Sequence, residues 1–155
     1  MVNVIYISGG RNLLDKIKPL WQELNKHHLN LSSHFKDYYQ ALMFEDRKRA
    51  ILQQADGGEL RVDIALNAQD EPVGYCVSTL NPSKAGEIAS IFVAVNCRHL
   101  GIGDTLMRKT LAWMDSKGAI SKIVEVGAGN EQAFGFYQRY GFFPRKTVLK
   151  QVTKA

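Results

Sequence analysis

The sequence predicts an α/β (α+β) fold in which helices flank one mixed sheet, and three observations support this class. Short stretches rich in β-branched residues alternate with longer stretches whose apolar residues recur at helical spacing. The chain has 155 residues, of which 45% are hydrophobic and 23% charged, as in a globular protein. No internal repeat or Pro/Gly/Ser-rich linker divides it, so we expect residues 1–155 to form a single domain.

The first half of the chain predicts one strand, two helices and a hairpin. Residues 2–8 are rich in Val and Ile and end at a glycine pair, which favours a strand. Residues 12–29 and 34–54 carry apolar side chains at helical spacing, which predicts two helices. Residues 60–67 alternate between apolar and polar, and a polar turn separates them from a partner strand over 73–80.

The second half predicts strands interleaved with helices. Residues 87–95 are apolar enough for a strand that is buried on both faces. A glycine-containing loop should follow at 98–103, and a helix should then run to about residue 117. A strand at 121–128, a short helix at 130–140 and one or two closing strands at 143–152 should come after them. The order is β-α-α-β-β-β-α-β-α-β, with one optional further strand, which amounts to about six or seven strands and four helices.

Composition excludes several classes of protein. No apolar stretch approaches the roughly 20 residues of a membrane span, and residues 2–7 are too short a run for a signal peptide. We therefore expect a cytoplasmic protein without a membrane partner. Cys76 and Cys97 form no CxxC pair and lie in no metal-ligand spacing, so we expect buried thiols and no metal site. The net charge of +5 favours an anionic partner, which could be a phosphorylated cofactor, nucleic acid or an acidic surface.

One loop has the features of a phosphate-binding site. Residues 98–103 (Arg-His-Leu-Gly-Ile-Gly) connect a buried strand to an amphipathic helix, and they offer no Ser, Thr, Asp or Asn to cap the helix start. The glycines let a ligand approach the backbone, while the helix dipole and Arg98 favour an anion. Leu106 stands where a dinucleotide fingerprint needs its third glycine, and Gly103 is not followed by the lysine of a P-loop. A tight turn without a ligand is the alternative.

A second motif begins 27 residues after Gly103, across a helix and a strand. Asn130 suits a helix N-cap and Gly141 the position after the helix end. The stretch between them reads N-x-x-A-x-x-F-Y-x-x-x-G-F when Phe142 is included. Together with the preceding R-x-x-G-x-G loop, it resembles the GNAT superfamily of acyl-CoA-dependent N-acetyltransferases. The resemblance covers residues 85–143 in detail.

The resemblance implies a mostly antiparallel sheet in which the strands at 87–95 and 121–128 splay apart and admit acetyl-CoA. The backbone of the first strand would pair with the pantetheine arm, the glycine loop would hold the pyrophosphate, and Asn130 would contact the pantetheine. The cofactor-binding residues that it implies are Phe92, Val93, Val95, Arg98, His99, Leu100, Gly101, Ile102, Gly103, Asp104, Asn130 and Tyr137.

The resemblance also implies catalytic residues whose chemistry fits acetyl transfer. Tyr137 would point its hydroxyl at the thioester sulfur and protonate the departing thiolate as general acid. A backbone N–H of the first splayed strand would polarise the carbonyl. Glu125, between two valines, or Glu87, at the start of the first splayed strand, would accept the proton of the amine. Each glutamate could instead be a partnered structural carboxylate, and the amine could arrive already neutral.

The predicted function is transfer of an acetyl group from acetyl-CoA to a primary amine on a small molecule or peptide. Asp104 departs from the family pattern, and its charge should weaken pyrophosphate binding unless the side chain turns outward. The two N-terminal helices would build the acceptor pocket. Their aromatic residues are either its lining or plain core: His34, Phe35, Tyr38, Tyr39 and Phe44.

Two alternatives belong to other functional classes. The first is a non-catalytic acyl-CoA-binding or sensory module in which Tyr137 and the glutamates are structural. The second is a nucleic-acid-binding protein that uses the basic run Arg47–Arg49 together with Lys146 and Lys150. No nucleic-acid-binding motif accompanies those charges, so we expect no nucleic-acid partner. The sequence leaves a homodimer open.

Overall fold

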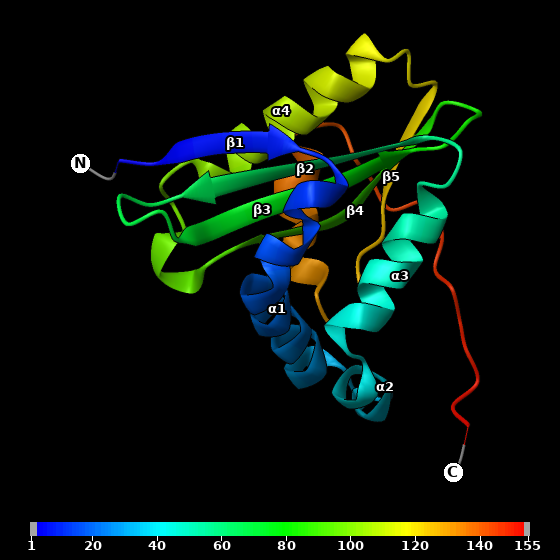
Figure 1. Cartoon of the computed structure of the whole chain (residues 1–155). Helices are drawn as coiled ribbons and strands as arrows, with labels where there is room; N and C mark the ends of the chain where they lie inside the picture. The colour runs from blue at the N-terminus through cyan, green and yellow to red at the C-terminus, as the bar shows by residue number, and fades with distance from the viewer. Residues whose placement is uncertain (1–2, 154–155) are drawn as a thin grey trace.

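The computed structural model describes residues 3–153, in which one five-stranded sheet carries helices on both faces (Figure 1). The strands lie in chain order, β1 to β4 are antiparallel, and β5 runs parallel to β4. This arrangement confirms the predicted mixed and mostly antiparallel class. The strands are Ile5–Gly9 (β1), Glu59–Leu66 (β2), Pro72–Leu80 (β3), Ala85–Val93 (β4) and Ser121–Val124 (β5).

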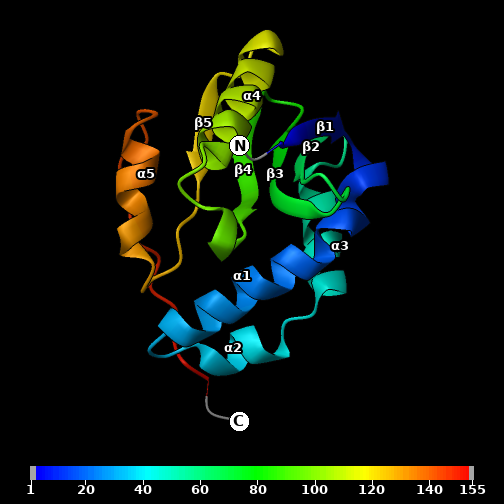
Figure 2. The same ribbon diagram turned by 90° about the vertical axis from the view of Figure 1, so that its left-hand side faces the viewer.

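The helices form a layer on each side of the sheet. The helix α4 covers one face, and α1, α2 and α3 lie on the other (Figure 1). The short helix α5 stands beside the β5 end of the sheet (Figure 2). The α-helices are Lys18–Leu31 (α1), Lys36–Ala41 (α2), Phe44–Gln54 (α3), Ile102–Ser116 (α4) and Phe134–Gln138 (α5), and the 3₁₀ helices are Arg11–Ile17 (η1), Val95–Cys97 (η2) and Glu131–Ala133 (η3).

Two apolar clusters fix these layers to the sheet. On the α1–α3 side, Leu14, Ile17 and Ile51 pack onto the sheet with no exposed surface. On the α4 side, Leu106 and Met107 are equally buried. Full burial of such a side chain contributes about 1.5–3 kcal/mol to the free energy of folding. The α1–α3 layer and α4 are therefore held by the core rather than by their own helix propensity.

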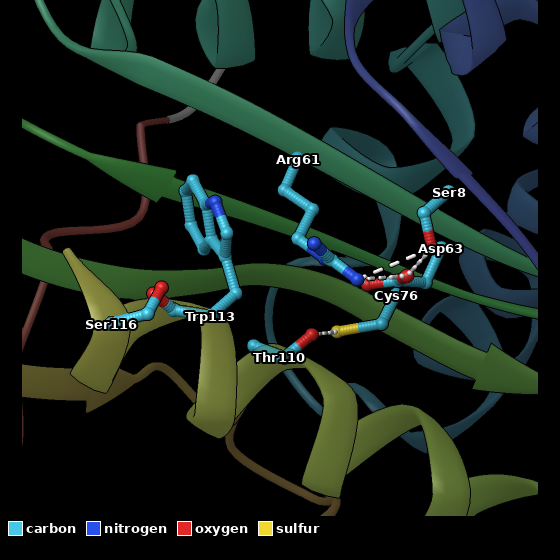
Figure 3. Close-up of polar contacts among 7 residues, drawn as sticks. All are labelled: Ser8, Arg61, Asp63, Cys76, Thr110, Trp113 and Ser116. Carbon is cyan, nitrogen blue, oxygen red and sulfur yellow. Dashed lines mark hydrogen bonds and ion pairs between the residues drawn. The ribbon is translucent and has the colours of Figure 1, made fainter.

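A buried polar cluster lies between α4 and the sheet (Figure 3). The Asp63 carboxylate is fully buried, and Ser8 Oγ donates to it over 2.5 Å while Arg61 Nε and Nη2 donate over 2.8 and 3.0 Å. These donors satisfy a charge that would otherwise be costly to bury. Nearby, Thr110 Oγ1 donates to Cys76 Sγ over 3.2 Å. Burial raises the pKa of the Cys76 thiol to about 12, so it stays protonated at neutral pH.

The helix predicted over residues 34–54 is two helices, α2 and α3. The chain breaks between them at Leu42 and Met43, whose backbone is extended. The Asp46 carboxylate accepts a hydrogen bond from the Met43 N–H over 3.0 Å, which caps α3 and favours a new start there. The continuous helical spacing of the sequence does not show this break.

The closing strands predicted over residues 143–152 are wrong, and the sheet has five strands rather than six or seven. Residues 143–153 belong to no strand, and this C-terminal segment runs away from the sheet (Figure 1), so its backbone groups have no strand to pair with. The apolar side chains are exposed instead: Phe143 by 70%, Val148 by 80% and Leu149 by 92%. β5 is also shorter than predicted, because it ends at Val124 rather than near residue 128.

Candidate functional site

The strands β4 and β5 separate halfway along β4, as the resemblance implies. Their parallel pairing runs only from Ala85 with Ser121 to Ile88 with Val124, whereas β4 continues to Val93. The register between β3 and β4 shifts at the same point, which leaves Ala89 as a bulged residue. Because a bulge bends its strand, it explains why β5 does not follow β4 further. The second half of β4 therefore has one open edge.

The pairing of β4 with β3 decides which backbone groups face that open edge. The Ala94 N–H donates to the Val73 carbonyl over 2.8 Å, so Ala94 faces β3. Backbone groups alternate along an antiparallel strand, and Phe92 therefore also faces β3, while Ile91 and Val93 face the open edge. Sequence reasoning named Phe92 and Val93 and missed Ile91, because the bulge that sets this alternation has no signal in the sequence.

The glycine loop opens α4 without a side-chain cap, as predicted. Gly101 is the N-cap residue, with φ of +80°, and no side chain caps the helix there. His99 also has a positive φ, of +65°. Within residues 3–153, none of the six backbone N–H groups from His99 to Asp104 donates to a protein atom. Consecutive bare amides at the start of a 15-residue helix are the donors that an anion site requires.

The other predicted loop residues are placed less directly. Val95 is 72% exposed at the start of η2. The Arg98 guanidinium folds back onto β4, where Nε donates to the Val93 carbonyl over 3.2 Å and Cζ lies 5.4 Å from the centre of the Phe92 ring. Arg98 thus covers the end of the open edge. Asn130 precedes η3, and its side chain makes no capping hydrogen bond there.

Tyr137 enters the site from α5, which is only five residues long. Its ring is half-buried against the core cluster on the α4 side, next to Phe136 and Phe142. Burial is the main cause that raises the pKa of the Tyr137 hydroxyl to about 12, and Cys76 adds to the shift. Tyr137 is therefore protonated at neutral pH, which is the form that a proton donor needs.

Asp104 turns away from the bare amides. Its carboxylate accepts hydrogen bonds from Arg108 Nε, over 2.8 Å, and from the Tyr140 hydroxyl. Arg139 Nη2 lies 3.7 Å away. The negative charge that was expected to oppose a pyrophosphate is therefore faced by two cations and one hydroxyl donor.

The two glutamates lie on the opposite side of the strand gap from Tyr137. Glu87 is half-buried in β4, and Glu125 is exposed one residue past β5. Burial raises the pKa of Glu87 above its ordinary value, the charge of Glu125 raises it further, and Arg47 opposes the shift. Arg47 belongs to α3 and donates to the carbonyl of the bulged Ala89. The arrangement brings two carboxylates and one guanidinium to the α1–α3 side of the opening.

Sequence reasoning missed His28, which lies on the same side. Its ring stacks on Tyr39 with centroids 5.6 Å apart, and a Cβ on Gly127 would lie 3.2 Å from the Tyr39 hydroxyl and 3.8 Å from His28 Nδ1. Gly127 comes two residues after Glu125, so the chain beyond β5 runs against α1 and α2 here. Burial lowers the pKa of His28, and His27 lowers it further, which favours the neutral imidazole. Nothing in the sequence indicated that Gly127 packs against Tyr39 and His28.

The predicted aromatic lining of the acceptor pocket divides into two groups. Phe44 is buried and packs edge-on against Trp21 with centroids 5.6 Å apart, so it belongs to the core. Tyr38 is 54% exposed and meets Tyr39 edge-on at 5.1 Å. A cavity of about 200 Å³ lies between α1, α2 and α3, and both Tyr39 and Phe44 line it, so Phe44 belongs to the core and to the cavity wall.

The basic run of α3 does not form a free cationic strip. Arg47 is turned inward to Ala89, Lys48 pairs with Asp15 over 2.7 Å, and Arg49 lies 3.6 Å from Asp46. Lys48 and Arg49 line an open groove of about 580 Å³ that contains none of the predicted site residues. The described part of the chain holds no group of three or more His, Cys, Asp or Glu side chains placed for a metal ion. Nor does it contain a helix long and apolar enough to cross a membrane.

Comparisons with known proteins agree with this geometry. The model of the acetyltransferase (GNAT) family matches residues 20–142. An uncharacterized N-acetyltransferase of Methanocaldococcus jannaschii is 34% identical over an alignment of 86 residues that covers 50% of this chain and 37% of that relative. The match therefore spans little more than a third of the relative's length.

Solved structures show the same fold at low identity. An acetyltransferase of the GNAT family from Staphylococcus aureus Mu50 has a TM-score of 0.71 and 18% identity, over 93% of this chain and 87% of that one. An aminoglycoside N-acetyltransferase in complex with CoA has a TM-score of 0.63 and 19% identity, over 100% of this chain and 97% of that one.

Proposed function

The chain belongs to the acetyltransferase (GNAT) family, and from this premise we propose that it transfers an acetyl group from acetyl-CoA to a primary amine. The observation that carries the proposal is the run of bare amides from His99 to Asp104, beside the open edge of β4. Such donors suit the pyrophosphate of an acyl-CoA. The aminoglycoside N-acetyltransferase of the same fold was crystallised with CoA and with a CoA bisubstrate analogue, which supports this donor.

The residues present fit an acyl-CoA along its length. The amides of the glycine loop would hold the pyrophosphate, and Gly101 leaves the approach free because nothing lies within 4 Å of a Cβ built there. The backbone groups of Ile91 and the N–H of Val93 would pair with the amide groups of the pantetheine arm, as an added strand pairs with a sheet edge. The side-chain amide of Asn130, which makes no capping hydrogen bond to η3, would contact the pantetheine arm.

The chemistry that we propose divides between the two sides of the gap. Bound acetyl-CoA supplies an activated thioester carbonyl. A backbone N–H on the open edge of β4 donates to the carbonyl oxygen and polarises it. The neutral amine forms the new C–N bond as the C–S bond breaks, and Tyr137 donates its proton to the departing sulfur. Burial raises the pKa of Tyr137, and it also raises the pKa of a CoA thiol beside it. The proton affinities of the donor and the departing sulfur therefore rise together, and the proton can still move to the sulfur.

The proton of the amine leaves on the other side, through Glu87 or Glu125. A raised pKa brings Glu87 closer to neutral pH, where a general base works best. Glu125 has the freer access, because it lies just beyond the end of β5. The two carboxylates also favour an acceptor that carries a positive charge before it is deprotonated.

Turnover tests the proposal. Wild-type protein, acetyl-CoA and a panel of small-molecule and peptide amines are incubated, the released thiol is measured, and the product mass is checked for one added acetyl group. We expect thiol release that depends on the amine. Binding of acetyl-CoA without release for any amine would support the non-catalytic acyl-CoA-binding alternative instead.

We also propose a cytoplasmic location, since both cysteines are free thiols.

The dependence of turnover on pH separates the two candidate bases. A base must be deprotonated, so the rate rises with pH through its pKa. If Glu87 is the base, Glu125→Gln removes a neighbouring negative charge, lowers the pKa of Glu87, and shifts the acidic limb of the kcat profile to lower pH. If Glu125 is the base, the same change abolishes that limb, whereas Glu87→Gln does not abolish it. If the acidic limb of the kcat profile survives both substitutions, neither Glu87 nor Glu125 is the base.

A further inference from the structure

The junction between α4 and α5 contains a polar cluster that acetyl transfer itself does not need. Asp104 lies in the first turn of α4, and Tyr140 and Arg139 follow α5. The Tyr140 hydroxyl donates to Asp104 Oδ1, and Arg139 Nη2 lies 3.7 Å from the same oxygen. The other oxygen, Oδ2, accepts from Arg108 of α4 itself. One carboxylate therefore ties the end of α5 to the start of the helix that carries the bare amides.

Apolar contacts continue from this cluster to Tyr137. The Arg139 guanidinium lies over the rings of Phe136 and Tyr140, 5.7 and 5.6 Å from their centroids. Phe136 packs edge-on against Tyr140 at 5.4 Å and against Tyr137 at 5.3 Å. A Cβ on Gly103 would lie 3.3 Å from the Phe136 ring, so this ring rests directly on the first turn of α4.

α5 depends on these contacts for its position. It has five residues, far fewer than an isolated helix needs in water, and none of them is fully buried. Its half-buried rings pack against the core, and the hydrogen bond and charges at Asp104 add polar contacts at its C-terminal end. Tyr137 is the fourth of its five residues, so the position of its hydroxyl depends on the position of α5.

We propose that Asp104 is a positioning residue that holds α5 against the first turn of α4 through Tyr140 and Arg139, and thereby orients Tyr137 toward the opening between β4 and β5. The proposal rests on the role of Tyr137 in the proposed function. It explains why a carboxylate is tolerated beside the bare amides: Asp104 faces the cluster and not the anion site. The cluster, with one anion and two cations, leaves an excess of positive charge near the loop.

We expect the contacts of Asp104 with Tyr140 and Arg139 to persist at pH values around neutral. The hydrogen bond from Tyr140, and then that from Arg108, hold the pKa of the Asp104 carboxyl below its usual range. Burial, followed by the bond to Asp104, raises the pKa of Tyr140 to about 12. Arg108 and Arg139 are the other charged groups that face this carboxylate. Asp104 therefore stays ionised and Tyr140 stays protonated between mildly acidic and mildly basic pH.

The test compares Asp104→Asn and Tyr140→Phe with Asp115→Asn. Asp115 is a matched control because it lies near the other end of α4 and pairs with Lys122 of β5, far from Tyr137. We expect both cluster variants to lower kcat about tenfold or more while acetyl-CoA binds as well as to wild type, or better once the negative charge is gone. The two changes combined should cost little more than either alone. Asp115→Asn should keep kcat within about twofold.

Hydrogen–deuterium exchange over residues 134–142 gives a second readout that needs no turnover. We expect faster exchange there in both cluster variants and unchanged exchange in Asp115→Asn. Unchanged exchange would overturn the tie, and faster exchange with unchanged kcat would overturn the positioning role. A rise in the KM for acetyl-CoA at constant kcat would also contradict it, because it would make Asp104 a cofactor-binding residue. If wild type has no turnover, the proposed function fails, and exchange still decides whether the tie exists.

Discussion

Replacing Tyr137 by Phe should lower kcat by about 10²–10⁴-fold while the affinity for acetyl-CoA changes little. The ring keeps its contacts with Phe136 and Phe142, so α5 should stay in place. What is lost is the hydroxyl, and with it the proton for the departing sulfur. The measurement is single-turnover acetyl transfer together with calorimetric titration of acetyl-CoA.

Tyr6→Phe is the matched control for this change. Tyr6 lies on β1, at the other end of the sheet, and packs against the same core cluster as Tyr137. It should keep wild-type kcat and wild-type affinity. If Tyr137→Phe turned over as fast as this control, Tyr137 would be a core aromatic and not the general acid.

The second large effect is expected from Gly101→Glu, which places a carboxylate at the bare amides. A like charge close to a bound pyrophosphate should weaken acetyl-CoA binding by about 10- to 100-fold. The backbone at Gly101 has φ of +80°, so any side chain also costs about 1–2 kcal/mol of stability there. Binding and unfolding must therefore be measured on the same preparation.

Gly118→Glu separates charge from backbone strain. Gly118 lies just past the other end of α4, with φ of +77° and, like Gly101, nothing within 4 Å of an added Cβ. It should lose as much stability as Gly101→Glu or more, because a carboxylate is unfavourable at a helix C-terminus. Its affinity for acetyl-CoA should stay at the wild-type value. Equal loss of affinity in both variants would contradict the anion site.

The sequence predicted the parts of this structure that local chemistry decides. The hairpin of β2 and β3, the strand β4 and the uncapped start of α4 follow from alternation, apolar runs and glycine placement, which act over a few residues; in β4, however, only every second residue is buried, rather than both faces. The resemblance carried by the two motifs also implied that β4 and β5 separate, but not at which residues. Their roles in binding and catalysis stay predictions until the variants above are measured.

What the sequence could not show depends on contacts between distant residues. The bulge at Ala89 is a mismatch of register with β3, and it decides that Ile91 rather than Phe92 faces the opening. The sequence alone suggested that Asp104 would weaken pyrophosphate binding, because its partner Tyr140 lies 36 residues away along the chain and could not be identified from the sequence. The segment 143–152 has the pattern of a strand, but a pattern alone cannot supply the neighbouring strand that it would pair with.

Thermal unfolding with and without acetyl-CoA tests most directly whether the open edge of β4 and the bare amides form an acyl-CoA site. NAD and ATP serve as controls, because both carry phosphates but no pantetheine arm. Ligand at about a hundred times its Kd adds roughly 2.7 kcal/mol, which for this length corresponds to a rise in Tm of about 5–10 °C. We predict that rise with acetyl-CoA alone. No rise with acetyl-CoA, or an equal rise with all three ligands, would contradict the account.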